Sequence, residues 1–173
     1  MAQPQGDLLI EPLGSHHDRK GFSCGVDSLD RYLRTQAGQD IRRKAAGVFV
    51  LAERTEPGVV LGYYTLSSTG IAQGDVPAAA RRHVPRYPLV AATLIGQLAV
   101  SQARQGERLG AVLIADAVRR AWFTASSVGS SMLVVDAINE RAAAFYEGNG
   151  FVRLPDSQRL VLPMHVIQRL VEP

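Results

Sequence analysis

The sequence predicts a mixed α/β fold, with helices and strands in layers, as a single domain over residues 1–173. Three observations support this prediction. A chain of 173 residues with 46% hydrophobic and 20% charged residues can bury a core of its own. Short apolar runs typical of strands alternate with segments of helical periodicity. Near the middle, a strand, a glycine-containing turn and a helix follow one another, as in a crossover connection.

The N-terminal part of the chain predicts a strand, a helix and a hairpin. Apolar residues recur at helical spacing from Val26, and Asp27 and Asp30 occupy the first turn, where the helix dipole favours acidic groups. The turn Glu56-Pro57-Gly58 separates two strand-like runs and predicts an antiparallel hairpin. The expected elements are a flexible terminus at residues 1–7, strands at 8–13, 48–52 and 59–67, and a helix at 26–37.

The C-terminal part predicts an exposed loop followed by alternating strands and helices. Three prolines in residues 70–88 prevent a sheet or a long helix there, so we expect a loop with at most a short helical turn. Asn139 can cap a helix that Gly148-Asn149-Gly150 then ends with a left-handed residue. The expected elements are strands at 89–100, 132–138, 151–154 and 159–164, and helices at 109–123 and 140–147.

The net charge of +3 is distributed unevenly. Residues 19–44 carry seven Lys or Arg against three Asp, and residues 79–108 carry five Arg against one Glu. Arginine suits bidentate contact with phosphate, so these segments are either solvated surface or contacts for a polyanion. The loop expected at residues 70–88 is correspondingly either an element that holds a substrate or a solvated connector between strands.

Cysteine content and hydropathy exclude several classes of protein. Cys24 is the only cysteine, so an internal disulfide and cysteine-cluster metal ligation are excluded, and we expect no metal. We interpret it as a small buried residue. No apolar run approaches the length of a membrane span, and a secretory leader pattern is lacking. We therefore expect a cytoplasmic protein without a membrane partner.

Residues 97–113, QLAVSQARQGERLGAVL, join an apolar strand to a helix through a polar turn that contains Gly106 and Gly110. Glycines let a backbone approach a ligand closely, and the unpaired amides that open a helix favour an anion. The turn lacks both the Lys-Ser/Thr pair of a P-loop and a complete GxGxxG. The pattern therefore predicts a phosphorylated cofactor without defining which one.

Two stretches together resemble the GNAT acetyltransferase superfamily. RQGERLGAVLIADAV, from Arg104, is similar to its motif A, (Q/R)xxGx(G/A), and NERAAAFYEGNGF, from Asn139, is similar to its motif B, a helix ending AxxFYxxxGF. Gln105 and Gly110 match the ends of motif A, whereas Arg108 stands where the middle glycine usually is. The resemblance covers nearly the whole chain and implies a GNAT fold, a central, mostly antiparallel, splayed sheet flanked by helices.

The superfamily implies acetyl-CoA as the donor and an amine as the acceptor. Amides of Leu98 and Val100 would hold the pantetheine and polarise the thioester, and amides from Gln105 to Gly110 would hold the pyrophosphate. Asn139 would assist from the next strand, and the Arg108 guanidinium could add a charge-assisted contact. The implied cofactor-binding residues are Leu98, Ala99, Val100, Gln105, Gly106, Glu107, Arg108, Leu109, Gly110, Asn139 and Tyr146.

Tyr146 in motif B is the candidate catalytic residue. A phenol stays protonated at neutral pH and can donate a hydrogen bond, or a proton, to a departing thiolate. The alternative is that Tyr146 simply packs beside Phe145. For a general base the candidates are His83, His16 and His17, although an amine of low pKa needs only water.

A closer resemblance joins the chain to the acetyltransferase toxins of type II toxin–antitoxin pairs. It rests on FSCGVDSLDRYL near the N-terminus, GYYTLSS, the arginine-rich proline loop and the terminal LVLPM. That family acetylates the α-amine of aminoacyl-tRNA, which blocks translation, and a ribbon-helix-helix antitoxin neutralises it. The resemblance implies tRNA contact by Arg81, Arg82 and Arg86, and homodimerisation, which is common in the family.

Two other functions remain open at the level of sequence. The chain could be an N-acetyltransferase for a small amine or a protein N-terminus, in which case the three loop arginines would be replaceable. It could also be a non-catalytic acyl-CoA-binding module that has kept the turn for binding alone. A Tyr146→Phe protein that binds cofactor but loses turnover would argue against the second.

Overall fold

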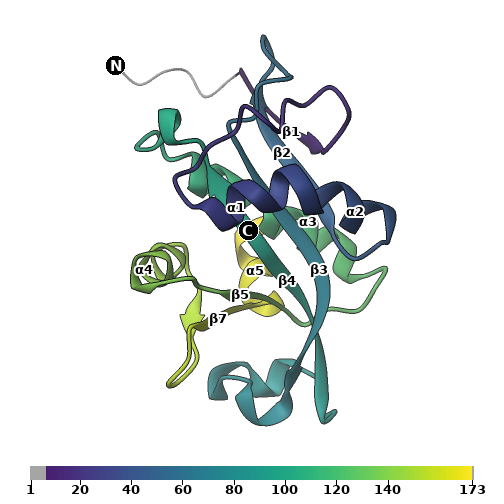
Figure 1. Ribbon diagram of the computed structural model, residues 1–173. Coiled ribbons are helices and arrows are strands. Elements are labelled where there is room, and N and C mark those ends of the chain that lie inside the picture. The colour runs from purple at the N-terminus through teal and green to yellow at the C-terminus, as the bar shows by residue number, and fades with distance from the viewer. Residues whose placement is uncertain (1–6, 173) are drawn as a thin grey trace. The chain divides into compact units, whose positions relative to one another are not determined.

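The computed structural model describes residues 7–172, so the flexible terminus expected at residues 1–7 lies outside the described residues apart from Asp7 (Figure 1). The described chain forms a mixed α/β fold, as predicted. Its strands form a seven-stranded sheet in the order β1-β2-β3-β4-β5-β7-β6. They are β1 (Leu8–Pro12), β2 (Gly47–Glu53), β3 (Gly62–Ala72), β4 (Leu89–Val100), β5 (Met132–Asp136), β6 (Val152–Arg153) and β7 (Arg159–Pro163).

Among the described residues, four of the strand pairs are antiparallel and one is parallel. β2 pairs with β1 and β3, and β7 pairs with β5 and β6, all antiparallel. β4 and β5 run parallel, with Thr93–Ile95 beside Leu133–Val135. A parallel pair needs a long crossover, and the helix between these strands supplies it. The predicted hairpin, strand 89–100 and crossover are confirmed.

Five α-helices and several shorter helical turns complete the described part of the chain. Asn139 caps α4, because its side-chain oxygen accepts from the amide of Ala142 at 2.8 Å. Gly150 has a φ of +95°, the left-handed residue expected after this helix. The α-helices are α1 (Asp27–Arg31), α2 (Ala37–Arg42), α3 (Leu109–Ala125), α4 (Glu140–Gly148) and α5 (Met164–Val171), and a π-helical turn, Tyr32–Gln36, joins the first two.

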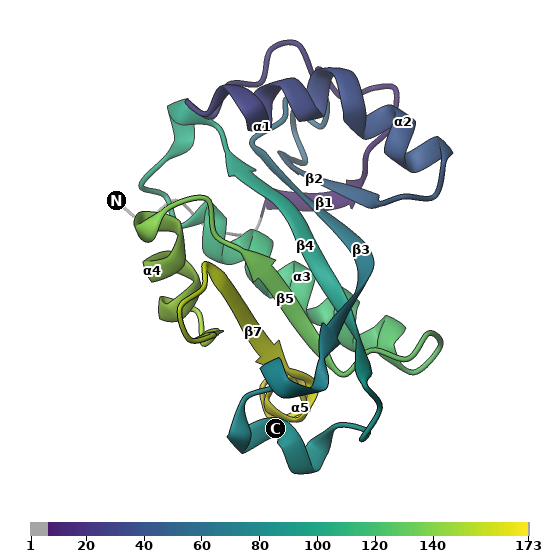
Figure 2. The same ribbon diagram turned by 60° about the horizontal axis from the view of Figure 1, so that its bottom comes forward.

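The chain divides into two compact units. The first comprises the chain up to Leu66 with Gln97–Leu113, and the second comprises Ser67–Gly96 with Ile114 onward. In the first, the run from α1 to α2 packs on β2, as both ribbon views show (Figures 1 and 2). The Tyr63 hydroxyl ties β3 to this run by donating to the Leu29 carbonyl at 2.6 Å. Its core contains Phe22, Cys24, Leu29, Leu33, Ala37, Val48, Val50, Val60, Tyr63 and Ala99.

The second unit has its own core and contains the predicted loop. β3 extends further than expected, to Ala72, and short 3₁₀ turns at Gln73–Asp75 and Ala78–His83 follow it. We call residues 73–88 the basic loop. Helix α5 packs on β7, and the sequence reading did not predict it. The buried residues of this core are Ile71, Val76, Ala80, Val84, Val90, Ala92, Met132, Val134, Leu154 and Val161.

Within residues 7–172, none of the helices combines the length and the apolar character that crossing a membrane requires.

Candidate active site

Two hydrogen bonds show which way the backbone amides point at the C-terminal end of β4. The amide of Gln97 donates to the Thr65 hydroxyl on β3 at 3.0 Å, and the amide of Ser101 donates to a carbonyl just before β3 at 2.8 Å. Successive amides of a strand point to opposite edges. The amides of Leu98 and Val100 therefore point away from β3. This orientation suits the pantetheine contacts that were predicted for them.

The turn between β4 and α3 presents backbone amides with no partner of their own. Gly106 has a φ of +88° and Arg108 a φ of +60°, so both lie in the left-handed region. In the described part of the chain, no hydrogen bond leaves the amides of Gly106, Glu107 or Arg108. They stand directly before the N-terminus of α3, which begins at Leu109. Unpaired amides and a helix dipole together form a site for an anion.

Side chains of the turn bond to neighbouring segments and hold the turn in place. The Gln105 amide group donates to the Cys24 carbonyl at 3.0 Å and to the carbonyl at the end of β4 at 3.4 Å. Arg104 pairs with Glu53 at 2.8 Å and with Glu107 at 2.7 Å. The backbone amide of Gln105 donates to the Gln102 carbonyl at 3.5 Å, so both nitrogens of this residue are engaged within the protein. Cys24 is buried, as predicted, and burial first of all raises the pKa of its thiol to about 11.

This donor set fits the diphosphate of an acyl-CoA. The three unpaired amides supply hydrogen bonds without a side-chain cation, and the Arg108 guanidinium is exposed beside them. The left-handed φ of Arg108 explains why a glycine is usual at this place in motif A, since a side chain there strains the backbone.

Tyr146 lies on α4 in the second unit and is 7% exposed. Its ring packs edge-on against Phe145 and Phe151, with ring centroids 5.2 Å and 5.6 Å away. Burial raises the pKa of Tyr146 well above its ordinary value of 10.0. Among the described residues, none forms a hydrogen bond with its hydroxyl. The ring is thus fixed by packing while the hydroxyl keeps its proton and its donor capacity.

Asn139 is exposed, and its side chain is committed to α4 as the cap. Its oxygen accepts from the amide of Ala142, which leaves the amide nitrogen for any contact with a cofactor. The sequence predicted both the cap and the cofactor contact, and the cap is confirmed. The contact stays a prediction.

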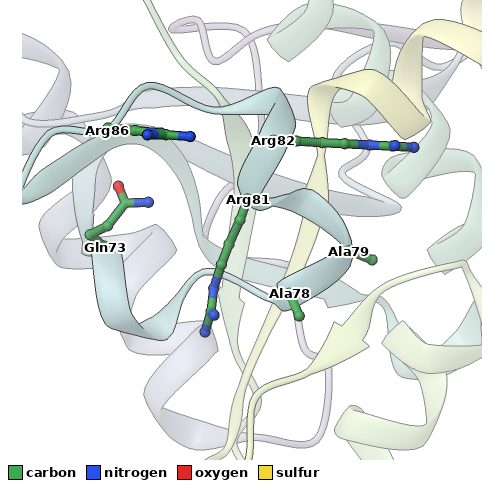
Figure 3. Close-up of a pocket in the computed structure, with 6 residues that line it drawn as sticks. All are labelled: Gln73, Ala78, Ala79, Arg81, Arg82 and Arg86. Atoms are coloured by element: carbon green, nitrogen blue, oxygen red, sulfur yellow. The ribbon is translucent and has the colours of Figure 1, made fainter.

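The basic loop carries its arginines on the outside of an anchored backbone. Val76 and Ala80 are buried at 1% exposure, whereas Arg81, Arg82 and Arg86 are exposed. These arginines line an open basin of about 720 Å³ together with Gln73, Ala78 and Ala79 (Figure 3). Figure 3 shows that Arg81 and Arg82 point in different directions. The loop is thus an ordered, cationic surface.

None of the three histidines considered as a general base has an uncommitted ring. His17 is buried, accepts from the Gly14 amide at its Nδ1 and contacts Glu11 with its Nε2 at 3.1 Å. His16 contacts the same carboxylate at 2.7 Å. Burial is the main cause that lowers the pKa of His17. His83 Nε2 accepts from Arg82 Nε at 3.2 Å.

Glu11, His16 and His17 also have the residue types and spacing of a metal site, since their ligand atoms lie within 4.8 Å of one another. The hydrogen bond at His17 Nδ1 opposes that role. A neutral ring that accepts at Nδ1 carries its proton on Nε2, which is the nitrogen that a metal would need.

Two basic side chains of α5, next to the basic loop, were not predicted from the sequence. The rings of His83 and His165 stack with centroids 3.9 Å apart, and Arg169 lies on the same helix, α5, as His165. Only the strand pattern of LVLPM was recognised there, so the helix that positions these residues was not anticipated.

An acyl-CoA carries a diphosphate and a thioester, and the unpaired amides of the turn and the β4 amides that face away from β3 would suit these two groups, as is typical of acyl-CoA-dependent transferases. The sequence model of the acetyltransferase (GNAT) family matches residues 16–151. The chain belongs to this family and is an acetyl-CoA-dependent N-acetyltransferase.

The chain is similar to toxins within this family. A "tRNA-acetylating toxin" of Mycobacterium tuberculosis is 35% identical over 156 residues, which cover 89% of this chain and 90% of the relative. The structure of AtaT complexed with acetyl-methionyl-tRNAfMet has a TM-score of 0.87 and 31% identity, covering 95% of this chain and 99% of that one. A tyrosine-to-phenylalanine variant of AtaT, bound to the C-terminus of the antitoxin AtaR and to acetyl-CoA, has a TM-score of 0.81 and 29% identity, covering 96% and 99%.

Proposed function

We propose that this protein is a toxin that transfers the acetyl group of acetyl-CoA to the α-amine of aminoacyl-tRNA and so blocks translation in the cytoplasm. The similarity to AtaT, solved with acetyl-methionyl-tRNAfMet, carries this proposal. Two features of the chain support it independently. The basic loop offers three exposed arginines to RNA phosphates, and the buried Tyr146 suits a donor to a leaving thiolate.

The proposed roles follow from the local geometry. The amides of Leu98 and Val100 donate to the pantetheine and to the carbonyl oxygen on which negative charge develops. The amides of Gly106, Glu107 and Arg108 hold the diphosphate. Bound acetyl-CoA supplies the acetyl group as an activated thioester.

Tyr146 is proposed to donate a hydrogen bond to the departing sulfur. As the amine nitrogen forms its bond to the carbonyl carbon and the C–S bond breaks, negative charge collects on sulfur, and the amine loses a proton to water. Burial holds the pKa of Tyr146 far above the pKa of an ordinary thiol, which is about 8.5. Full transfer of the phenolic proton is therefore uphill, and the stabilising hydrogen bond is the more favourable role.

Two partners belong to the proposal. An antitoxin would neutralise this protein, as AtaR is bound to the related AtaT, and we expect a ribbon-helix-helix protein for this role. We also expect a homodimer. A short neighbouring reading frame for a ribbon-helix-helix protein would support the first, and the mass of the purified protein in solution tests the second.

The enzymatic proposal is tested by transfer of labelled acetyl groups into acid-precipitable RNA. Charged tRNA should accept label from acetyl-CoA, and the same tRNA stripped of its amino acids should accept none. Label in both samples would place the acetyl group on the nucleic acid itself and contradict the proposed acceptor. Transfer to small amines alone would identify an N-acetyltransferase of another kind.

A further inference from the structure

Four basic side chains meet where the basic loop contacts α5. Arg82 and His83 end the 3₁₀ turn of the loop, and the His83 ring stacks on His165 with centroids 3.9 Å apart and planes 15° apart. Arg169 follows His165 by four residues, so both project from the same face of α5. In Figure 3, Arg82 extends toward the α5 ribbon. We call these four residues the loop–helix cluster.

The cluster has donors but no acidic partner. Arg82 Nε donates to His83 Nε2 at 3.2 Å, which leaves the rest of the guanidinium facing outward. Over the described residues, neither Arg82 nor Arg169 forms an ion pair. Other arginines of this unit are paired, such as Arg153 with two carboxylates of α4 and Arg159 with Asp136. Unpaired cations held side by side repel one another, and a bound anion would relieve that repulsion.

The electrostatics of His165 agree with such a site. Burial, followed by the charges of His83, Arg169 and Arg82, lowers the pKa of His165 below its ordinary value of 6.5. A phosphate placed against the cluster would reduce the local positive charge and favour protonation of the ring.

We propose that Arg82, His83, His165 and Arg169 bind phosphates of the tRNA backbone, so that the RNA-binding surface continues from the basic loop onto α5. The inference rests on the proposed function and adds to it a surface from a second element. Arg82, His83 and Arg169 are exposed and His165 is half-buried, and basic side chains without acidic neighbours in the described structure suit a sequence-independent contact, because phosphates recur along any RNA.

The test measures binding of an uncharged tRNA to the full-length protein at several salt concentrations. Arg82→Gln and Arg169→Gln should each weaken binding about eightfold near 0.1 M salt and lower the slope of log K against log salt by about 0.9. Arg119→Gln is the matched control, since Arg119 is an exposed arginine on α3 with no ion pair in the described structure. Its effect should be less than twofold.

The histidines are tested by pH. Binding by the natural protein should tighten as the pH falls from 8 to 6, because phosphate favours protonated His165, and His165→Gln should reduce this dependence. Arg82, His83 and Arg169 are the charged and titratable groups facing that ring, and they are unchanged in this variant. An unchanged pH dependence would exclude His165 from the site.

Three results would overturn the inference. Equal losses in Arg119→Gln and Arg169→Gln would mean that net charge alone matters. A weaker affinity for acetyl-CoA with unchanged tRNA affinity would assign the cluster to the cofactor phosphates. Unaltered tRNA binding in both cluster variants, with charged tRNA still acetylated by the natural protein, would refute the cluster and leave the proposed function intact. Failure of the natural protein to acetylate or bind tRNA would instead refute the proposed function.

Discussion

Two substitutions of Arg108 distinguish the backbone strain at this position from the contact of its side chain with the cofactor. Its φ of +60° costs an L-residue roughly 1–2 kcal/mol, while glycine adopts this conformation freely and loses roughly 0.5–1 kcal/mol of chain entropy on folding. Arg108→Gly and Arg108→Ala both remove the guanidinium, but only the glycine removes the strain. The glycine variant should therefore be about 1 kcal/mol more stable than the alanine variant, or about 2–4 °C higher in melting temperature.

Gly106 provides the converse control. Its φ is +88°, and a Cβ added there would meet no atom within 4 Å, so Gly106→Ala tests the dihedral angle alone. That variant should lose about 1 kcal/mol of unfolding free energy. Calorimetry gives the melting temperature and the unfolding free energy of all three variants. Titration with acetyl-CoA gives the cofactor affinity, which should fall about five- to tenfold in both Arg108 variants because the guanidinium contact is lost. An alanine variant as stable as the glycine variant would refute the reasoning about strain.

Three further predictions concern the reaction, the turn and the response to acid. Tyr146→Phe should lower kcat about 100-fold or more and leave the KM for acetyl-CoA within about threefold, and an equal rise in KM would point to a packing role. Gln105→Ala removes the hydrogen bond to the Cys24 carbonyl, so acetyl-CoA affinity should fall with little change in kcat; unchanged affinity would mean that the turn is held without it. His17 is buried and its pKa is lowered, so the unfolded chain binds the extra proton and stability falls as the pH drops below about 6.5. In chemical denaturation, His17→Asn should reduce the fall of the unfolding free energy with decreasing pH. A smaller fall of the same sign should remain, because the pKa of His165 is also lowered. An unchanged dependence on pH would exclude His17 as its cause.

Local patterns were sufficient to predict most of the sheet. Leu89–Val100 is strand over its whole predicted length, because the prolines before it and the glycine-containing turn after it mark both ends. The cap at Asn139 and the left-handed Gly150 likewise follow from local chemistry, and both are present. Such features depend on neighbours in sequence, which is why they can be read without a fold.

Features that depend on distant residues could not be read in this way. The π-helical turn at Tyr32–Gln36 inserts one residue into an otherwise helical pattern, and apolar periodicity over so short a segment does not register it. α5 follows directly on β7 at Pro163, and the predicted strand 159–164 took in only its first residue, so no helix was predicted there. Without that helix, no pattern in the sequence connects His83 with His165.

The candidate site shows the same division. Motifs A and B predicted the turn and Tyr146, and the structure adds what their side chains do there. The Gln105 side chain donates to the Cys24 carbonyl and holds the turn, and Arg108 occupies a left-handed position. Neither orientation follows from residue type, because each is determined by contacts with other segments or by the path of the backbone.

The most direct test of the central claim is mass spectrometry of charged tRNA after reaction with acetyl-CoA and digestion with nuclease. With the natural protein we expect aminoacyl-adenosine that carries one added acetyl group on its α-amine. With Tyr146→Phe the amount of this product should be greatly reduced. Charged tRNA that remains unacetylated for every amino acid, with a small amine or a protein N-terminus acetylated under the same conditions, would contradict it.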